Sequence, residues 1–152
     1  MRAFDDMRPE FDLLGRFMEK YVQISKQPVD FGTGEDLYPS EIHTLAVVCS
    51  HGSLGVTDLA RATGVTKGAV SQLLSRLEDK GLVSRTQDPD NRSRIIIAPT
   101  DKGMAAQAGH MAFHREHDKE FLAFIASLPD EDYRVFQTLC IRLNQWMDTY
   151  LE

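Results

Sequence analysis

The chain has 152 residues and a formal net charge of -6, from 17 basic and 23 acidic residues. This length suits one domain or one core with appended elements, and it excludes a large multidomain enzyme. The negative charge excludes a general basic coat for nucleic acid or anionic lipid, so any such contact must be local. Hydrophobic residues make up 42% and charged residues 26%, which is typical of a folded globular domain.

Cysteine usage and the N-terminal segment predict a reducing compartment. Cys49 and Cys140 lie far apart in the chain and form neither a disulfide framework nor a CxxC motif. Both fall on apolar helix positions, which favours packing over oxidant sensing. Charges interrupt the first residues, where a signal peptide carries an apolar stretch, and nowhere do about 18 apolar residues run together. We expect a cytoplasmic protein that makes no membrane contact.

Apolar spacing predicts two helices in the first third of the chain. Residues 5–25 carry apolar side chains at intervals of three and four, and a loop rich in proline and glycine follows over 27–38. A second helix is expected to begin near Pro39, which suits a first helical turn, and to stop at Gly52. Its strongly apolar interior predicts a central position in the fold.

Two short helices joined by a tight turn come next. The first is expected over residues 57–63, with Thr57 as its cap and Gly64 at its end. The second is expected to begin after Thr66 and to end at Gly81. This arrangement predicts a helix-turn-helix.

The rest of the chain is expected to form a hairpin and two more helices. Runs 82–85 and 94–97 favour β-strands on either side of a turn-forming cluster. Thr100 is placed to cap a long helix that continues to about Ala126, and a last helix begins near Pro129. The order predicts a mainly α fold with a small β wing, namely a winged helix-turn-helix with further helices on each side.

The polar face of the second helix of this motif is the candidate DNA-reading surface. A major groove about 12 Å wide admits one α-helix, whose polar side chains then reach base edges. Gln72 can read adenine through two hydrogen bonds, and Arg76 can pair with guanine or with a phosphate. The face consists of Thr66, Lys67, Gly68, Ser71, Gln72, Ser75 and Arg76. An ordinary solvated helix face is the alternative.

Three arginines and one serine lie close to the turn of the predicted hairpin: Arg85, Arg92, Ser93 and Arg94. A basic tip beside a recognition helix is typical of a wing that enters the minor groove, where a narrow groove attracts arginine. Asp90 is placed to orient Arg92 through a charge-assisted hydrogen bond. A solvated turn is the alternative. Residues 61–102 hold eight basic and five acidic residues, so the acidity belongs to the rest of the chain.

In these features the chain resembles the MarR family of winged-helix transcriptional regulators. The segments that carry the resemblance are PSEIHTLAVV, VTDLARATGVTKGAVSQLLSRLEDKGLVSR and DPDNRSRIIIAPT followed by DKG. The Asp-x-Arg pattern of the family's wing falls on Asp90 and Arg92. Two positions depart from the family pattern: Pro99 stands where leucine is usual, and Tyr38 stands where a capping threonine is common.

The resemblance implies a domain organisation and a function. Residues 1–38 would form an N-terminal dimerisation helix and loop, 39–100 the DNA-binding winged helix-turn-helix, and 101–152 the C-terminal dimerisation helices. A homodimer would bind a palindromic operator in double-stranded DNA, as a repressor whose affinity is modulated by a small effector. An enzyme is not expected.

The last helix supports a dimer on physical grounds as well. Its apolar side chains are too many to end a monomer comfortably, and two recognition helices must be held about one DNA turn apart. These side chains are Phe136, Leu139, Leu143, Trp146, Met147 and Tyr150. Packing within one subunit is the alternative.

A histidine cluster is a candidate metal sensor. His110, His114 and His117 follow at i, i+4 and i+7, so they can share a helix face, and imidazoles at i and i+4 can chelate zinc. His43 lies on the second helix, with Glu41 close by. Zinc-responsive members of the resembled family use a histidine pair and a histidine of the second helix, which is similar to His110, His114 and His43. The remaining acidic ligand is left open among Glu19, Asp30, Glu35 and Glu41, and a polar helix face is the alternative.

The family resemblance more often implies a small organic effector, of aromatic or lipid-like character. The candidate pocket is mostly apolar and consists of Phe17, Tyr21, His43, Val47, Met111 and His114. Core packing explains most of these residues equally well. Two other functions are kept as alternatives: a winged helix for protein contact without DNA affinity, and a metal-dependent hydrolase, which lacks an accompanying nucleophile or general base.

Overall fold

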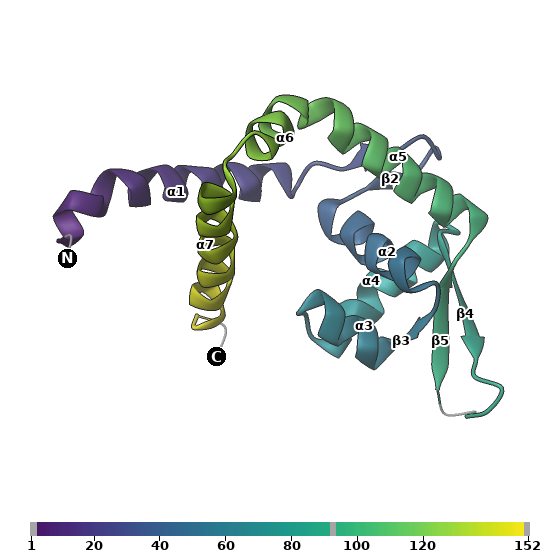
Figure 1. The fold of residues 1–152 in the computed structure, drawn as a ribbon. Coiled ribbons are helices and arrows are strands. Elements are labelled where there is room, and N and C mark those ends of the chain that lie inside the picture. The colour runs from purple at the N-terminus through teal and green to yellow at the C-terminus, as the bar shows by residue number, and fades with distance from the viewer. Residues whose placement is uncertain (1–2, 92–93, 151–152) are drawn as a thin grey trace. The chain divides into compact units, whose positions relative to one another are not determined.

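The structure is a computed structural model and describes residues 3–91 and 94–150 (Figure 1). The chain divides into two compact units, Met1–Met111 and Ala112–Glu152, which are described separately. The elements are α1 (Phe4–Ile24), β1 (Val29–Asp30), β2 (Asp36–Leu37), α2 (Pro39–His51), β3 (Leu54–Gly55), α3 (Val56–Thr63), α4 (Lys67–Asp79), β4 (Val83–Gln87), β5 (Ile95–Pro99), α5 (Asp101–His117), α6 (Lys119–Ala126) and α7 (Asp130–Asp148). None of the described helices is both long and apolar enough to span a bilayer.

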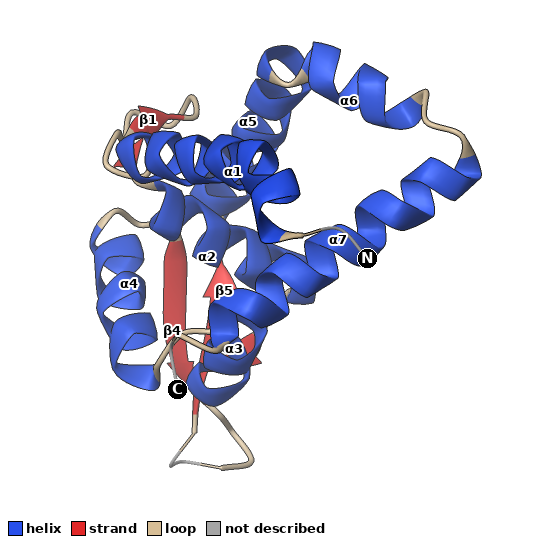
Figure 2. Cartoon of the chain, turned by 90° about the vertical axis from the view of Figure 1, so that its left-hand side faces the viewer, coloured by secondary structure: helices blue, strands red, loops and turns tan. Residues whose placement is uncertain are grey.

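The first unit contains a winged helix built around one apolar core. Helices α2, α3 and α4 pack against one another, and strands β4 and β5 lie beside α4 and α3 (Figure 2). The largest fully buried apolar side chains come from α2, α3, α4 and β5, from β2 and from the residue before β4: Ile42, Leu45, Val48, Leu59, Val70, Leu74, Leu77, Ile97, Leu37 and Leu82. The apolar stripe of α4 is therefore buried in the core, and its polar face is exposed to solvent. This confirms the predicted winged helix-turn-helix.

The predicted hairpin is present and gains a third strand. β4 and β5 pair antiparallel, with Arg85 opposite Ile97, and β3 pairs with the other edge of β5. β3 was not predicted, because two residues are too short for a periodic pattern and their partner lies about 40 residues away. A second small ladder, β1 with β2, lies inside the segment predicted as a loop.

The ends of the helices in the winged helix follow local rules, with one correction. Pro39 occupies the first turn of α2, and Gly52 ends it with a φ of 70°. The hydroxyl of Thr66 accepts the Ala69 N–H at 3.3 Å, so the predicted cap of α4 is confirmed. The prediction for α3 was wrong: Gly55 is its N-cap, and Thr57 lies inside the helix. Pairing of β3 with β5 holds the chain extended up to Gly55, which sets the start of the helix there.

The second unit contains α6 and α7, and it shows that the long helix predicted from Thr100 to Ala126 is interrupted. The Thr100 hydroxyl accepts the Gly103 N–H at 3.0 Å, which confirms the predicted cap of α5. The helix ends at His117, and Asp118 has φ -97° and ψ 8°, outside the α-helical range. No proline or glycine lies at this bend, so the apolar spacing predicted one continuous helix across it. α7 begins directly after Pro129, as predicted.

Candidate nucleic-acid interface and histidine cluster

The turn of the helix-turn-helix presents the N-terminal half of α4 to solvent. Gly64 ends α3 in the left-handed region, with a φ of 69°, so the chain turns within three residues from α3 to α4. The first turn of α4 has no acidic residue. The partial positive charge of the helix N-terminus is therefore left uncompensated, which suits an approaching phosphate.

The sequence-predicted contacts on α4 share one exposed face. All seven are exposed: Thr66, Lys67, Gly68, Ser71, Gln72, Ser75 and Arg76. Within residues 3–91 and 94–150, the side chains of Lys67, Gln72 and Arg76 make no described hydrogen bond or ion pair. Ser75 is engaged, since its hydroxyl donates to the Ser71 carbonyl at 3.1 Å. The long polar side chains are therefore available to a ligand, whereas Ser75 belongs to local structure.

Arg85 on β4 fastens the wing to the recognition helix. Its Nη2 donates to the Ser75 hydroxyl at 3.0 Å, and its Nε lies 3.0 Å from a Glu78 carboxylate oxygen. Arg94 is likewise engaged: Nη2 lies 3.4 Å from Asp58 of α3, and Nη1 lies 3.8 Å from Asp88. Both arginines were predicted as DNA contacts; the structure shows their ion pairs within the winged helix, and their contact with DNA stays a prediction. Asp58 had no signal in the local pattern, because it lies 36 residues from Arg94.

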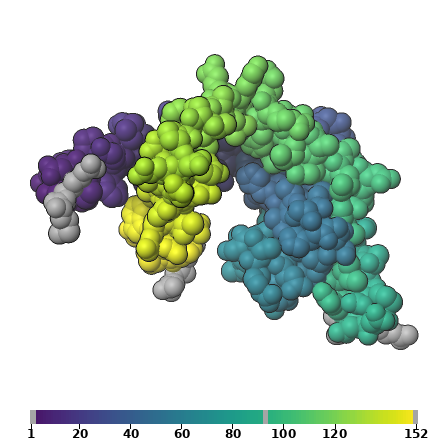
Figure 3. All heavy atoms as spheres, in the orientation of Figure 1, coloured from purple at the N-terminus to yellow at the C-terminus, as the bar shows by residue number. Residues whose placement is uncertain are grey.

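The tip of the wing projects past the helices of its own unit (Figure 3). Asp90 is exposed, and its backbone N–H donates to the Asp88 carboxylate at 2.9 Å. Arg92 and Ser93, the other two predicted contacts of the wing, lie outside the described residues. The orientation of Arg92 by Asp90 therefore stays a prediction.

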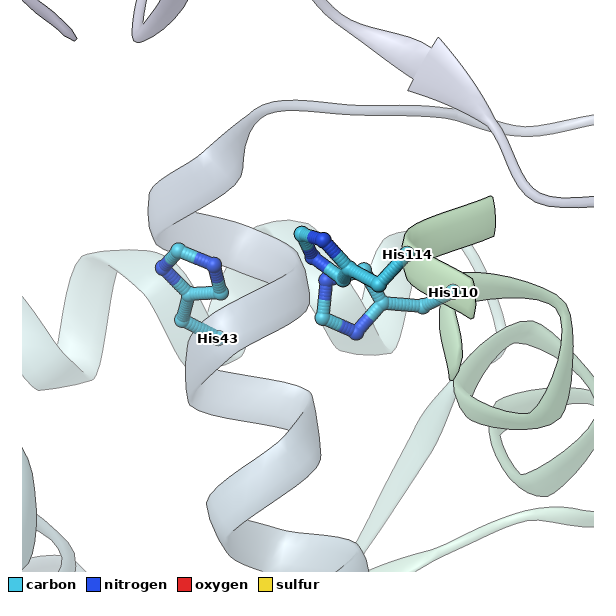
Figure 4. A group of neighbouring side chains, drawn as sticks. All are labelled: His43, His110 and His114. Atoms are coloured by element: carbon cyan, nitrogen blue, oxygen red, sulfur yellow. The ribbon is translucent and has the colours of Figure 1, made fainter. Parts of the chain in front are cut away.

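Three histidines of α2 and α5 form a cluster (Figure 4). The ring centroids of His43 and His110 are 5.7 Å apart, and His114 follows one turn later on α5. One ring nitrogen from each of His43, His110 and His114 lies within 4.8 Å of the others. His110 is buried and also meets Phe31 edge-on, whereas His43 is exposed. His117 is not part of the group and stacks on Phe113, with ring centroids 3.9 Å apart.

Three of the four carboxylates considered as further metal ligands have partners within the chain. Glu41 is 1% exposed, and the same oxygen accepts from Lys80 Nζ at 2.8 Å and from the Tyr38 N–H at 2.9 Å. Glu35 pairs with Lys102 at 2.7 Å. The Asp30 carboxylate accepts backbone N–H groups of its own loop, that of Thr33 foremost, and these hold its pKa below the usual value. Glu19 is exposed on α1.

Asp118 is a candidate site residue that the sequence reasoning missed. Its carboxylate lies 2.6 Å from Nδ1 of His114, one helical turn before it. The signal available in the sequence was the i, i+4 spacing of the two residues on a predicted helix.

The predicted effector residues lie on α1, α2 and α5. Val47 packs against the hydrophobic core. Phe17, Tyr21 and Met111 are exposed. The effector pocket stays a prediction.

The two cysteines differ in environment. Cys49 is partly buried against the core, and burial raises the pKa of its thiol, which lowers the thiolate fraction at neutral pH. Cys140 is exposed on α7, contrary to the burial expected from its apolar stripe. The environment of Cys49 therefore disfavours a reactive thiolate.

Comparison with known proteins finds one matching family model and several similar proteins. Residues 37–95, which span β2 to the start of β5, match the MarR family model. Over this segment the chain is similar to the MarR family. The HTH-type transcriptional regulator YhjH of Bacillus subtilis is 28% identical over 110 residues, which cover 72% of this chain and 63% of YhjH. The chain thus spans less than two thirds of the length of this relative.

Solved structures of other proteins share the fold over nearly the whole chain. FabT of Streptococcus pneumoniae in complex with DNA has a TM-score of 0.68 and 21% identity, covering 95% of this chain and 98% of FabT. ZitR of Lactococcus lactis, a zinc-responsive MarR family member, has a TM-score of 0.68 and 16% identity, covering 95% of this chain and 99% of ZitR. The predicted mainly α fold with a β wing is confirmed by these neighbours.

Proposed function

We propose that this protein is a sequence-specific DNA-binding transcriptional regulator that acts as a repressor on a palindromic operator. The observation that carries the proposal is the exposed face of α4, where Lys67, Gln72 and Arg76 point away from the core beside a wing. The apolar stripe of the same helix fills the core, so the polar face is available as a reading surface. Relatives named as HTH-type regulators and a neighbour solved with DNA support the proposal.

Charge distribution favours a local DNA contact. Residues 61–102 carry a net charge of +3 within a chain of -6. Positive side chains at the reading surface gain free energy by releasing counterions from phosphates, and the acidic remainder disfavours loose binding elsewhere. Arg85 and Arg94 contribute indirectly, because their ion pairs hold the wing against α4 and α3.

We propose a homodimer as the DNA-binding form. In the described chain, α6 and α7 contain no buried residue, although they carry large apolar side chains such as Phe121, Phe124 and Leu139. On α1, Phe17 and Tyr21 are exposed as well. Apolar faces of this size mark association surfaces, and a two-fold pair would present two recognition helices to the two halves of a palindrome.

Selection of bound duplexes from random DNA tests the proposal. The full chain is expected to retain a palindromic sequence whose half-sites are centred about one helical turn apart. Lys67→Ala should weaken binding similarly for all sequences and reduce the salt slope by about 1, because one phosphate contact is lost. Lys26→Ala, in the loop after α1, is the matched control and should leave both unchanged. Failure to retain any duplex would favour the alternative, a winged helix that contacts protein.

We propose a divalent metal such as zinc as the modulating effector, on the basis of the histidine cluster. Zinc binds imidazole nitrogens at about 2.0–2.1 Å, so two nitrogens on one tetrahedral ion lie about 3.4 Å apart. The observed separations of up to 4.8 Å are brought to this value by small side-chain rotations. His43, His110 and His114 would hold the ion, and a fourth position would take water or another donor. A zinc-responsive structural neighbour supports this choice.

Operator release assays test the effector. Zinc should change operator affinity by at least tenfold in the unmodified protein, and His110→Ala should abolish the change, because the buried ligand is lost. His117→Ala on the same helix is the control, since His117 stacks on Phe113 outside the cluster. A response to small aromatic or lipid-like compounds, with no response to zinc, would contradict the metal assignment.

A further inference from the structure

Asp118 stands at the junction of α5 and α6 and departs from the usual behaviour of its position. It is the N-cap of α6, where an aspartate side chain normally accepts a backbone N–H of the first helical turn. No such side-chain bond is present; the carboxylate instead reaches back one turn and lies 2.6 Å from Nδ1 of His114. The Asp118 carboxylate thus contacts the His114 imidazole in place of a backbone N–H of α6.

This contact determines which nitrogen His114 offers to a ligand. A carboxylate at hydrogen-bond distance from Nδ1 selects the tautomer with the proton on that nitrogen. The Nε2 atom then carries the lone pair and is the nitrogen that can bind a metal while the contact persists. On the same helix, Nδ1 of His110 lies 3.4 Å from Oε1 of Gln107.

We propose that Asp118 is a positioning residue for a metal bound by the histidine cluster, through its hydrogen bond to His114. The inference rests on the proposed metal site. Carboxylates that accept from the distal nitrogen of a ligating histidine fix the ring orientation and increase its basicity, and their loss typically weakens metal affinity by 10–100-fold. Asp118 contacts the ligating residue His114 and not the metal, so it changes metal affinity through the orientation and basicity of that imidazole.

Zinc competition against a chromophoric chelator, with the full-length protein, tests this role. Asp118→Asn keeps the size of the side chain and a good N-cap, and it replaces the carboxylate with a weaker acceptor. It should weaken zinc binding about 10–100-fold. Asp118→Glu, whose longer side chain can reach the same imidazole, should recover part of the affinity. Glu116→Gln, an exposed neighbour on α5, removes the same charge and should leave affinity within about twofold.

Two further measurements separate positioning from a structural role. Without metal, Asp118→Asn should melt within about 4 °C of the unmodified protein, because the pair is solvent-exposed. Bound cobalt should show visible bands that change in Asp118→Asn and stay unchanged in Glu116→Gln, because only the former alters a ligand.

The outcomes distinguish this inference from the site on which it rests. If the unmodified protein binds zinc no more tightly than His43→Ala, the proposed metal site is wrong and the inference falls with it. If the unmodified protein binds zinc tightly and Asp118→Asn binds it equally well, the site stands and the role of Asp118 is overturned. Equal losses in Asp118→Asn and Glu116→Gln would also overturn the role, since they would reflect charge alone.

Discussion

At the residue scale, the structure separates the polar side chains of the winged helix that have ionic partners from exposed side chains proposed to contact DNA. Arg85 and Arg94 are held by Glu78 and Asp58, so their guanidinium groups already have carboxylate partners. Gln72 is exposed on the polar face of α4. Side chains with charge partners position the wing, whereas unengaged side chains remain available for base edges.

Gln72→Ala is expected to relax base preference at one position of each half-site. A bidentate contact contributes about 1–3 kcal/mol of discrimination against the wrong base. Binding to DNA of unrelated sequence should change little, because the phosphate contacts remain. Gel shifts at constant salt, with operators substituted one position at a time, measure this effect.

Gln23→Ala serves as the control for this variant, because Gln23 is exposed on α1, away from the helix-turn-helix. The reading role of Gln72 would be refuted if the two variants discriminated equally well at every operator position.

At the element scale, the placement of α5 in the first unit depends on a close approach to the start of the wing. A Cβ at Gly103 would lie 2.0 Å from the Leu82 carbonyl oxygen and 3.3 Å from Leu45. A Cβ this close to a backbone oxygen forces either α5 or the segment around Leu82 to shift. Thr100 reinforces the same junction, because its hydroxyl donates to the Gly81 carbonyl at 2.7 Å.

Gly103→Ala is therefore expected to destabilise the fold, despite the better helix propensity of alanine. Overpacking of this kind costs about 1–3 kcal/mol and can cost more where backbone must shift. Gly68→Ala, also in a helix of this unit, meets no atom closer than 4.0 Å and should be neutral or stabilising by up to about 1 kcal/mol. Denaturant unfolding of the two variants compares them directly, and equal midpoints would contradict the close approach.

At the scale of the whole molecule, α1, α6 and α7 expose many large apolar side chains. Leu139 is 54% exposed on α7, and no residue of α7 is buried in the described chain. The winged helix, in contrast, has its own closed core. The winged helix thus folds around its own interior, whereas we propose that α1, α6 and α7 bury their apolar side chains by association of two chains.

Leu139→Glu is expected to shift the protein to monomers and to lower operator affinity with it. Placing a charge in an apolar interface costs about 2 kcal/mol or more for each subunit, and a two-fold axis counts the cost twice. Gln137→Glu adds the same charge about 200° around the helix and should leave the dimer intact. Sedimentation velocity reports the assembly; a Leu139→Glu dimer as stable as the Gln137→Glu dimer would be incompatible with an interface on this face.

The sequence by itself determined the features that arise from nearby residues. The apolar stripe of α4, its cap at Thr66 and the turn at Gly64 depend on contacts within a few positions, so local chemistry was sufficient to predict the helix-turn-helix. The i, i+4 spacing of His110 and His114 indicated a shared helix face for the same reason.

Only the tertiary structure decided what depends on residues far apart in the chain. The pairing of β3 with β5, the bracing of Arg94 by Asp58, and the burial of Glu41 against Lys80 join positions about 40 residues apart. The break at Asp118 is local, but it has no proline or glycine to mark it. Sequence periodicity reports which face of an element is apolar; it does not report which polar group from another element will meet it, because that choice is made when the elements pack.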